Sequence, residues 1–340
     1  MANSKTIAIL HNPVRDNAPA DERDVLDQVD AVAQSLPLLG LGAEILPFQP
    51  DLAQMKQTLL KLEPCCIFNL VEAVNGCSQL LHFAPSLFDY LRIPYTGAPA
   101  EALFVTTHKI LAKKWMALTG VPTPEWLALE NHSLSSPPFP ERYIIKPVNE
   151  EASVGLDAAA IVETGNRQEL VRKIRERQKL VGMACFAERF IEGREFNLSL
   201  LGTPQGTVVM PPAEMNFHFP AGIPKIMDYK AKWEDGTPEY ANTRRTFDLP
   251  QADGELVERL KRTALTCWDL FHLRGYARVD FRVDEAGRVF VLEINANPCL
   301  SEGSCFPAAC ERAGLSFPEM VQRILTEALH RDAPQQPRPA

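Results

Sequence analysis

ARVDFRVDEAGRVFVLEINANP, residues 277–298, is the most informative segment of this chain. Its centre, Asp284–Gly287 (DEAG), consists of residues that favour a turn. Apolar runs flank this turn on both sides, so the segment predicts a β-hairpin whose antiparallel strands span Ala277–Val283 and Arg288–Ala296. The position of the turn also predicts which residues of the two strands lie opposite each other.

Polar side chains of this hairpin are expected to meet on one face. Residues paired across a hairpin have a constant index sum, which places Asp280 opposite residue 292 or 293. Side chains alternate between the two faces of a strand, so Glu293 and Asn295 share a face. That face can also carry Asp280, with Arg278 two residues away on the same side.

Two carboxylates and one carboxamide on one face supply hard oxygen ligands, which Mg²⁺ takes when phosphates complete its shell. Asp280, Glu293 and Asn295 therefore predict a metal site. The alternative is an ordinary pair of strands whose polar face meets water. That alternative leaves Glu293 without a partner on a mostly apolar strand, which is energetically costly.

The first hundred residues alternate short apolar strands with amphipathic helices. The pattern predicts strands at Thr6–Leu10, Ala43–Phe48 and Cys65–Leu70 and helices at Asp21–Leu36 and Leu52–Leu62. Such alternation indicates a parallel, doubly wound sheet, whose ligand site lies beyond the carboxyl ends of its strands. Residues near Asn12, Glu22 and Asn69–Glu72 are therefore better placed for function than residues on helix surfaces.

Prolines on both sides of a helical stretch at 102–119 suggest a domain boundary near residue 100. We expect an N-terminal domain at 1–100 and a second domain at 101–330, with lobes at about 121–190 and about 191–330. Further strands are expected at Tyr143–Pro147, Ala184–Phe190 and Phe196–Gly202, and helices at Arg167–Val181, Gln251–Leu273 and about Phe317–Arg331. The Pro- and Gln-rich tail, 331–340, is expected to be disordered.

Composition excludes several classes of protein. The 340 residues include 35 Lys+Arg and 43 Asp+Glu, and the net charge of -8 argues against a nucleic-acid or membrane-surface partner. No apolar run approaches the roughly 20 residues of a membrane span. The start, MANSKTIAIL, fits a first strand better than a signal peptide, so the eight cysteines favour reduced thiols and a cytoplasmic location. Cys299, Cys305 and Cys310 lack the paired spacing of a zinc site.

A lysine and a loop of small residues follow one another after the predicted boundary. Lys146 ends the strand YIIKP (143–147), directly before the loop EEASVGL (150–156). A lysine there can reach phosphate, and small residues let loop N–H groups approach a polyanion. GxxxxGK[ST] and GxGxxG are both missing, so a P-loop and nicotinamide or flavin binding have no support. Taken alone, Ser153 fits an ordinary turn and Lys109 a surface lysine.

Together these segments resemble the ATP-grasp ligases, and within them the D-alanine–D-alanine ligase family. The resemblance covers nearly the whole chain in the same order. The matching segments are ERDV (22–25), IPYTG (93–97), the helix with Lys109, YIIKPVNEEASVGL (143–156), AERFIEGREF (187–196), MDYKAKW (227–233), ARVD (277–280) and LEINANP (292–298). It implies an α/β protein of the ATP-grasp fold, in which an N-terminal doubly wound domain precedes two α+β lobes that clamp ATP.

The resemblance implies ATP and Mg²⁺ as cofactors. The metal would be two ions on the three hairpin ligands, with Mn²⁺ as a substitute. The implied ATP contacts are Lys109, Lys146 and Ser153 on phosphates, Glu188, Arg189, Phe190 and Ile191 on the base, Glu195 on the ribose hydroxyls, and Lys232 on a phosphate or substrate.

The resemblance also implies a reaction. The γ-phosphoryl group of ATP passes to a substrate carboxylate, and an amine then attacks the acyl phosphate. Arg278 is expected to stabilise the tetrahedral oxyanion, and Glu22 to bind the ammonium of the first substrate. Ser304 matches a substrate-carboxylate position, and Trp233 lies in the substrate segment. The expected partners are small, amino-acid-like molecules, and a homodimer is an expectation from the family.

The chain departs from the family around the amino-acid pocket. Trp233 replaces a Tyr of the family, and Ala152 replaces a Ser. In the family, that Tyr and that Ser form a hydrogen-bond network with the N-terminal Glu. Trp has a donor but no acceptor and Ala has neither, so that network is not expected in its usual form. Cys299 replaces a Gly, and FNLVEAVNG (68–76) replaces the HGxxGEDG segment.

Three functional hypotheses follow. The first is an ATP-dependent carboxylate–amine ligase with changed substrates, which the departures favour. The second is D-alanine–D-alanine ligase proper, and the third a nucleotide-binding protein without catalysis. His218 with Phe217 and Phe219 could line the second substrate's pocket, but we favour an apolar loop end packed on the lobe. The segment 231–245 is expected to act as a lid, and the basic run at 172–179 as a solvated helix face.

Overall fold

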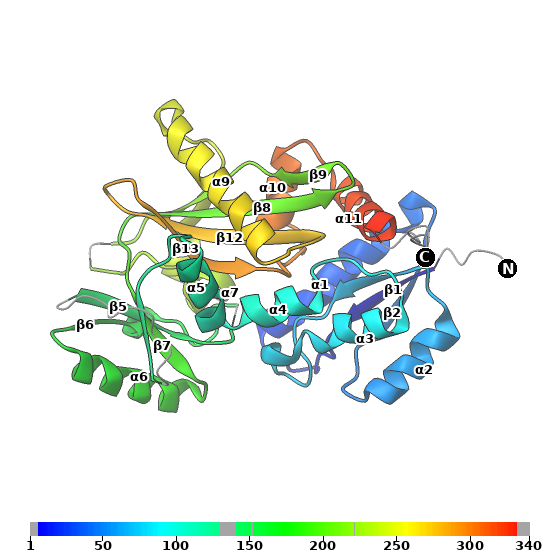
Figure 1. Cartoon of the computed structure of the whole chain (residues 1–340), viewed down its shortest axis with the longest axis horizontal. Coiled ribbons are helices and arrows are strands. Elements are labelled where there is room, and N and C mark those ends of the chain that lie inside the picture. The colour runs from blue at the N-terminus through cyan, green and yellow to red at the C-terminus, as the bar shows by residue number, and fades with distance from the viewer. Residues whose placement is uncertain (1–5, 130–140, 151, 221, 332–340) are drawn as a thin grey trace, which may run out of the picture.

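Three β-sheets form the framework of the protein (Figure 1). The computed structural model describes residues 6–129, 141–150, 152–220 and 222–331. In Figure 1 the parallel N-terminal sheet lies at the right, a small antiparallel sheet at the lower left, and the largest sheet between them. The tail that we expected to be disordered lies outside the described residues apart from Arg331, which ends the last helix.

The N-terminal sheet is parallel, as the sequence predicted. Its strands are β1 (Thr6–His11), β2 (Gly42–Pro47) and β3 (Cys66–Leu70), in the order β2-β1-β3. The connecting helices are α1 (Ala20–Ser35) and α2 (Leu52–Leu62), and α3 (Phe83–Leu91) follows β3.

Helices cover both faces of this sheet, because alternate residues of β1 enter different cores. Ile7 and Ile9 pack with apolar residues of α1 and of the C-terminal helix α11 (Phe317–Arg331). Ala8 and Leu10 pack on the other face, against α2 and α3. The domain is therefore doubly wound.

The largest sheet is antiparallel and central. Its strands are β8 (Arg194–Thr203), β9 (Gly206–Val209), β10 (Ala213–Phe217), β11 (Thr243–Thr246), β12 (Tyr276–Val283) and β13 (Val289–Asn295). They follow the order β11-β10-β8-β12-β13, with β9 also paired to β8. One face packs on α4 (Ala100–Thr107), α5 (Lys109–Leu118) and α9 (Gly254–Leu270).

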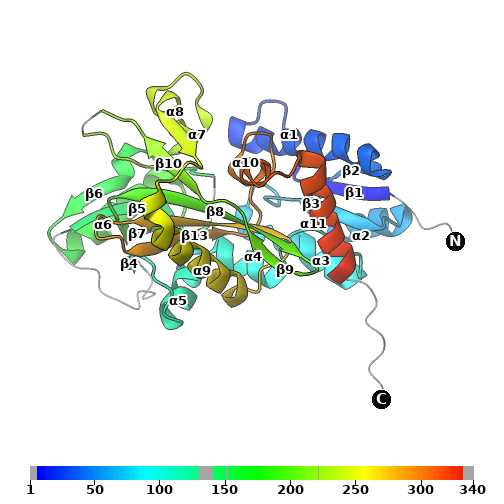
Figure 2. The same cartoon turned by 90° about the horizontal axis from the view of Figure 1, so that it is seen from above.

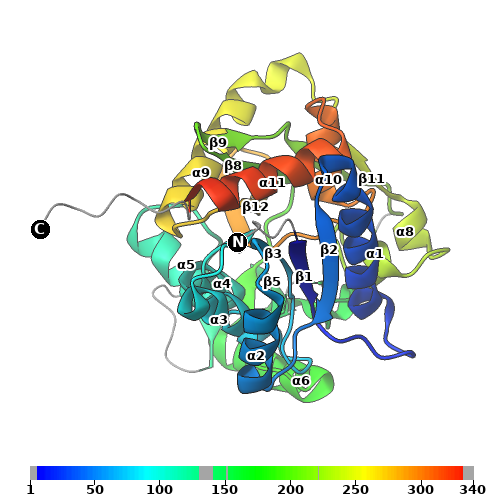
Figure 3. The ribbon, with the colours of Figure 1, turned by 90° about the vertical axis from the view of Figure 1, so that its right-hand side faces the viewer.

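Helix α11 joins the central sheet to the N-terminal sheet. It packs against both β8 and β3, and α10 (Cys305–Arg312) packs beside it (Figure 3). Their apolar residues share one core with β1, α1 and β3. The loop between β13 and α10 is held near the carboxyl end of β3, where Asn297 Nδ2 donates to the carbonyl of Val71 at 3.1 Å. The carboxyl end of the N-terminal sheet, where the sequence predicted functional residues, thus lies beside the C-terminal end of the β12–β13 hairpin.

The small sheet is antiparallel and is covered by one helix. Its strands are β4 (Trp126–Ala128), β5 (Glu141–Pro147), β6 (Ile161–Thr164) and β7 (Cys185–Arg189), in the order β4-β7-β5-β6. Helix α6 (Arg167–Val181) buries Leu170 and Ile174 against Tyr143 and Ile145 of β5. Its basic run lies at the surface except Arg177, which is buried and donates to the carbonyl of Gly155 at 2.6 Å.

The segment expected to be a lid forms regular structure. It contains α7 (Tyr229–Trp233), α8 (Pro238–Ala241) and the edge strand β11. Helices α7 and α8 project on the same side of the molecule as α1 (Figure 2). Asp228 begins α7 by accepting a hydrogen bond from the N–H of Ala231 at 2.9 Å, which is an ordinary N-cap.

The helix predicted at 102–119 is wrong in one respect, because His108 divides it into α4 and α5. His108 has non-helical dihedral angles, and its ring nitrogen Nδ1 accepts from the N–H of Leu111 at 3.3 Å. This cap places Lys109 in the first turn of α5. The predicted helix at 251–273 is also shorter, since a 3-10 turn (Gln251–Asp253) precedes α9.

The domain boundaries stay a prediction, although α4 begins at Ala100, close to the expected boundary. The residues of α4 and α5 already belong to the core of the central sheet. Within the described ranges, no helix is both long and apolar enough to cross a bilayer.

Candidate active site

One cavity of about 560 Å³ lies where the small sheet, the central sheet and α7 meet. Most of the residues proposed from the sequence line it. They are Lys109, Lys146, Ser153, Glu188, Arg189, Phe190, Ile191, Glu195, Lys232, Trp233, Arg278, Asp280, Glu293 and Ser304. Glu22 and Asn295 are not among its lining residues. Residues separated by almost two hundred positions in sequence therefore meet in one place.

The hairpin has the predicted register. Asp280 pairs with Glu293 and Arg278 with Asn295, so these four residues share a face. A β-bulge follows, because Phe281 pairs with Val291 and leaves Leu292 as an extra residue. The index-sum argument is thus confirmed at the functional end of the hairpin.

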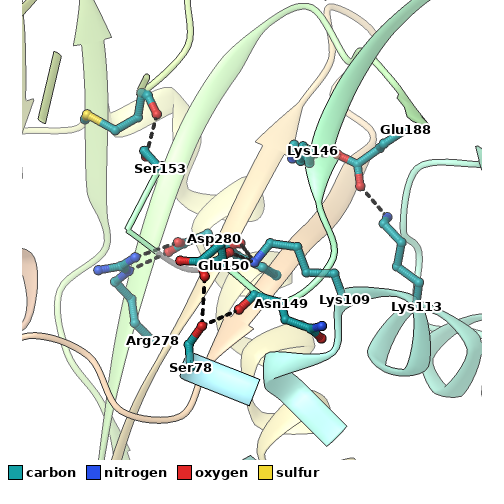
Figure 4. Close-up of polar contacts among 12 residues, drawn as sticks. Ser78, Lys109, Lys113, Lys146, Asn149, Glu150, Ser153, Glu188, Arg278 and Asp280 are labelled. Carbon is teal, nitrogen blue, oxygen red and sulfur yellow. Dashed lines mark hydrogen bonds and ion pairs between the residues drawn. The ribbon is translucent and has the colours of Figure 1, made fainter. Parts of the chain in front are cut away.

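Asp280 is buried and holds three hydrogen bonds. Arg278 donates from Nε to Oδ1 at 2.7 Å and from Nη2 to Oδ2 at 2.8 Å, which is a bidentate ion pair (Figure 4). Asn197 of β8 donates from Nδ2 to the same Oδ1 at 2.7 Å. The carboxylate and the guanidinium proposed for catalysis are therefore already oriented by each other.

Glu293 is partly buried and accepts an ion pair from Lys109 at 3.0 Å. Burial alone raises its pKa, but the charges of Lys109 and Lys146 outweigh that effect and lower the pKa to about 2. The carboxylate is therefore ionised at any physiological pH.

The hairpin residues fit a magnesium ion by the chemistry of their donors. Asp280 and Glu293 face each other with carboxylates that line the cavity, and Asn295 adds an amide oxygen on the same face. That amide oxygen accepts from the N–H of Asn297 at 2.9 Å, so one of its lone pairs is occupied. Within the described ranges no group of three His, Cys, Asp or Glu residues could hold a metal, so softer ligand sets have no support.

Glu188, Lys113 and Lys146 form a buried triad at the end of the cavity that the sequence analysis assigned to the base. Glu188 pairs with Lys113 at 2.5 Å and with Lys146 at 2.8 Å (Figure 4). Burial raises the pKa of Glu188, yet the two lysines lower it further, so the net shift is downward. Burial also lowers the pKa of Lys113, and Glu188 opposes this shift. The sequence analysis missed Lys113, whose only signal was its place one turn after Lys109.

The ion pairs of the triad leave the Glu188 carboxylate unavailable as an acceptor for a nucleotide. Its side chain is only 1% exposed and is fully engaged with lysines. The backbone of residues 188–191, together with the Phe190 ring, is what remains to contact a base. Guanidinium groups of Arg142 and Arg282 lie 5.4 and 5.6 Å from the centroid of that ring.

Glu195, proposed for the ribose hydroxyls, lies deeper in the cavity. Burial raises its pKa, and the opposing charge of Arg282 lies at 2.8 Å. Arg282 is itself held by the carbonyls of Gly193 and Lys225. Arg189 pairs with Glu125 at 3.1 Å, so its charge is already balanced by a carboxylate.

The phosphate loop is fixed to α7 by two contacts. Ser153, in the left-handed region at φ 61°, donates to the carbonyl of Met227 at 2.8 Å. The indole N–H of Trp233 donates to the carbonyl of Ala152 at 2.9 Å. The acceptor in this contact is the backbone carbonyl of Ala152. The hydrogen bond between Ser and Tyr side chains that we expect in the family cannot form here, because this chain has Ala152 and Trp233 at those positions.

Three further hydrogen bonds tie the N-terminal segment to this loop and to α7. The hydroxyl of Tyr229 donates to Asp21 of α1 at 2.7 Å. Ser78, in a 3-10 turn after β3, donates to the carboxylate of Glu150 at 2.9 Å and to the carbonyl of Asn149 at 2.8 Å (Figure 4). Lys109 donates to the carbonyl of Glu150. Tyr229, Asp21 and Ser78 could not be found from the sequence because their contacts cross domains.

The substrate end of the cavity differs from expectation at α1. Glu22 is exposed and lies outside the lining residues, whereas Asp24 of the same helix lines the cavity. Asp24 Oδ2 accepts from the thiol of Cys299 at 2.9 Å and from Gln28 Nε2 at 3.3 Å. Gln28 also donates to Glu72 at 2.8 Å and accepts from the N–H of Leu300 at 2.9 Å.

This network keeps Cys299 as a neutral thiol. Burial first, and then the charge of Asp24, raise its pKa to about 12. All eight cysteines are free, and Cys299 and Cys305 line the cavity. His218, Phe217 and Phe219 do not line it; Phe217 is buried with its ring 5.5 Å from that of Phe219, which agrees with an apolar loop end.

Three comparisons with known proteins agree with one another. A protein-family model described as "D-ala D-ala ligase C-terminus" matches residues 115–326, more than half of the chain. An uncharacterised protein of Sinorhizobium fredii, y4sG, is 29% identical over 78% of this chain and 75% of its own. A protein named D-alanine--D-alanine ligase of Rhizorhabdus wittichii is 28% identical over 94% of this chain and 97% of its own. The solved D-alanine--D-alanine ligase of Bacillus anthracis, complexed with ATP, superposes with a TM-score of 0.69 at 18% identity, covering 96% and 98% of the two chains.

Proposed function

The chain belongs to the D-Ala–D-Ala ligase family of ATP-grasp enzymes, and we propose that it joins the carboxylate of one small amino acid to the amino group of another. It is an ATP-dependent ligase that forms a carbon–nitrogen bond. The substrate carboxylate attacks the γ-phosphorus and ADP leaves, which gives an acyl phosphate. The amine then attacks the acyl carbon, and inorganic phosphate leaves as the amide bond forms.

ATP and Mg²⁺ are the cofactors of this family. We propose that Asp280, Glu293 and Asn295 hold two ions, and that Mn²⁺ can replace Mg²⁺. When bound, the metal neutralises charge on the phosphates. The support is the pair of opposed carboxylates of Asp280 and Glu293, in a cavity of about 560 Å³, and the ion pair between Glu293 and Lys109.

Three lysines and one loop are proposed to hold the triphosphate. Lys109 and Lys146 reach the cavity from α5 and β5, and Lys232 from α7. Ser153 lies in the phosphate loop, where its left-handed conformation turns the backbone. The backbone from Glu188 to Ile191 then faces the base and Glu195 the ribose hydroxyls.

Arg278 is proposed to stabilise the oxyanion that forms when the amine attacks. Its guanidinium is fixed by Asp280 and needs no reorientation during the reaction. For the ammonium of the first substrate we propose Asp24 in place of Glu22, because Asp24 lines the cavity and Glu22 does not. Ser304 and Trp233 are proposed to contact the substrates at the same end.

D-Alanine is the first substrate to test, because relatives with this chain's full length carry the name D-alanine--D-alanine ligase. The Trp233–Ala152 contact and the Asp24–Cys299 contact reshape the pocket, which supports different substrates. A homodimer and a cytoplasmic location stay proposals, and light scattering of the purified protein tests the first.

The single observation that carries the proposal is the shared face of Arg278, Asp280 and Glu293 within a cavity that three lysines line. The test is Mg²⁺-dependent ADP release with mass-spectrometric product detection. D-Alanine comes first, then pooled D- and L-amino acids. An amide product with one ADP per bond is the expected result.

Glu293→Gln removes a proposed metal ligand and should abolish turnover. Glu285→Gln, an exposed acid in the turn of the same hairpin, is the matched control and should keep it. Wild-type protein that binds ATP but releases no ADP with any amino acid would indicate a nucleotide-binding protein without ligase activity.

A further inference from the structure

Arg245 points into the cavity from an edge strand. It lies on β11, where it pairs with Met215 of β10, and both residues line the cavity. Thr243, two residues before it on the same face, lines the cavity as well. The sequence analysis had no role for Arg245.

Within the part of the chain that the structure describes, its guanidinium contacts neutral groups. Nη2 donates to the carbonyl of Gly303 at 2.8 Å, and Nη1 lies 3.5 Å from the sulfur of Cys305. The centroid of the Phe247 ring lies 5.9 Å from the central carbon of the guanidinium. Across residues 6–129, 141–150, 152–220 and 222–331, no carboxylate lies within ion-pair distance of Arg245.

Two of the other cations that line the cavity are neutralised by carboxylates. Arg278 pairs with Asp280, and Arg282 with Glu195. Arg245 is therefore a partly buried, oriented cation that has no counter-ion among the described residues. An arginine has five N–H groups, and two are used here, so three remain for a ligand. A carboxylate is the small anion that matches this planar donor set best.

The position of Arg245 suggests which anion it meets. Its two anchors, Gly303 and Cys305, flank Ser304 in the chain. Cys305 Sγ lies 3.8 Å from Asn197 Oδ1, and Asn197 Nδ2 lies 2.7 Å from Asp280. Arg245 is thus close to the hairpin residues around which the acyl phosphate would form. The hydroxyl of Ser304 already donates to the carbonyl of Cys299 at 2.8 Å, so Ser304 alone offers little to an anion.

We propose that Arg245 binds the carboxylate of the amine substrate and thereby selects an amino acid, rather than a simple amine or an amide, as the acceptor. This inference rests on the proposed ligase function. The acyl substrate's own carboxylate is consumed at the hairpin, and the triphosphate is proposed to lie on Lys109, Lys146 and Lys232. The acceptor's carboxylate is then the anion that remains for Arg245. The product then keeps a free carboxyl end.

A competition assay tests this proposal. The amino acid that gives turnover, D-alanine in the first instance, and its C-terminal amide are offered as acceptors at equal concentration. Mass spectrometry gives the ratio of the acid product to the amide product. Wild type should favour the acid at least tenfold, and Arg245→Gln should reduce this ratio about tenfold. Arg245→Lys, which keeps the charge but loses the planar fork, should fall between.

Controls separate binding from structure. Arg323→Gln removes an exposed arginine of α11, outside the cavity, and should leave the product ratio unchanged. The KM for ATP should change less than twofold in Arg245→Gln. A raised KM for ATP with an unchanged product ratio would assign Arg245 to phosphate instead and overturn the proposal.

A structural role is also distinguishable. If Arg245→Gln fails to fold, the wild-type ratio decides alone, since equal use of acid and amide contradicts selection by a carboxylate. Wild type that releases no ADP with any amino acid refutes the ligase function, and this inference falls with it. Wild type that turns over but shows no dependence on Arg245 refutes only the inference.

Discussion

Asp280 lies directly opposite Glu293 across the β12–β13 hairpin, and each carboxylate is already paired with a cation. Arg278 holds the first in a bidentate pair, and Lys109 holds the second from the start of α5. Two acids on one face normally repel each other, but here a cation lies beside each carboxylate. These ion pairs fix the positions of both carboxylates at the proposed metal site.

Asp280→Asn should reduce ADP release at least 100-fold and shift the Mg²⁺ concentration that gives half-maximal rate upward. The change removes one negative oxygen from the proposed metal site and also frees Arg278 from its partner. A Mg²⁺ titration of the initial rate measures both effects. Asp235→Asn, an exposed acid in the loop after α7, serves as control. An unchanged Mg²⁺ dependence would remove Asp280 from the metal site.

Tyr229→Phe should loosen the contact between α7 and α1 without affecting the fold. It deletes the hydrogen bond to Asp21, and one such bond contributes about 1 kcal/mol, so the KM for the amino acid should rise less than tenfold. Asp21→Asn in the same background should add little further, because both changes break one interaction. A double-mutant cycle on KM measures this coupling, and Tyr90→Phe, at an exposed position of α3, is the control. Fully additive effects would show that the two residues act separately.

The hairpin could be predicted from the sequence because its register depends on local features. Turn residues fix the centre, and the period of two fixes which side chains share a face. The same holds for α2, α6 and α11, whose apolar periods and ends matched the structure residue for residue. The strands β4, β6 and β9, of three or four residues, are too short to show a pattern.

Residues that function through distant contacts could not be found in this way. Asp24 enters the cavity and Glu22 does not, although both lie in the first turns of α1, because the rotation of that helix is set by its packing. The break at His108 lacks a Gly or Pro signal, since the histidine ring itself provides the cap. Arg245 gains its role only when β11 joins the edge of the central sheet.

Lys113→Met should destabilise the protein by about 3–5 kcal/mol. The change leaves the buried Glu188 with one lysine instead of two. Removing one partner of a buried ion pair is strongly destabilising, because the desolvation free energy of the remaining charge is no longer compensated. Urea unfolding measures the loss, and Lys179→Met, at an exposed position of α6, should cost less than about 0.5 kcal/mol. Adding Glu188→Gln to Lys113→Met should recover part of the stability. A loss below 1 kcal/mol for Lys113→Met alone would mean that Lys146 neutralises Glu188 by itself.

The Cys299 thiol should react with iodoacetamide far more slowly than a free cysteine. Only the thiolate reacts, and burial together with Asp24 raises the pKa of Cys299 to about 12, so at pH 8 the thiolate fraction is on the order of 1000-fold below that of glutathione. Asp24→Asn removes a negative charge that opposes ionisation, so the pKa should fall and the reaction should become faster. Peptide mapping of alkylation rates from pH 7 to 10 measures both proteins. Alkylation of wild-type Cys299 at the rate of glutathione, with no effect of Asp24→Asn, would show that the thiol does not contact this carboxylate in solution, and the proposed ammonium site at Asp24 would lose its positioning partner.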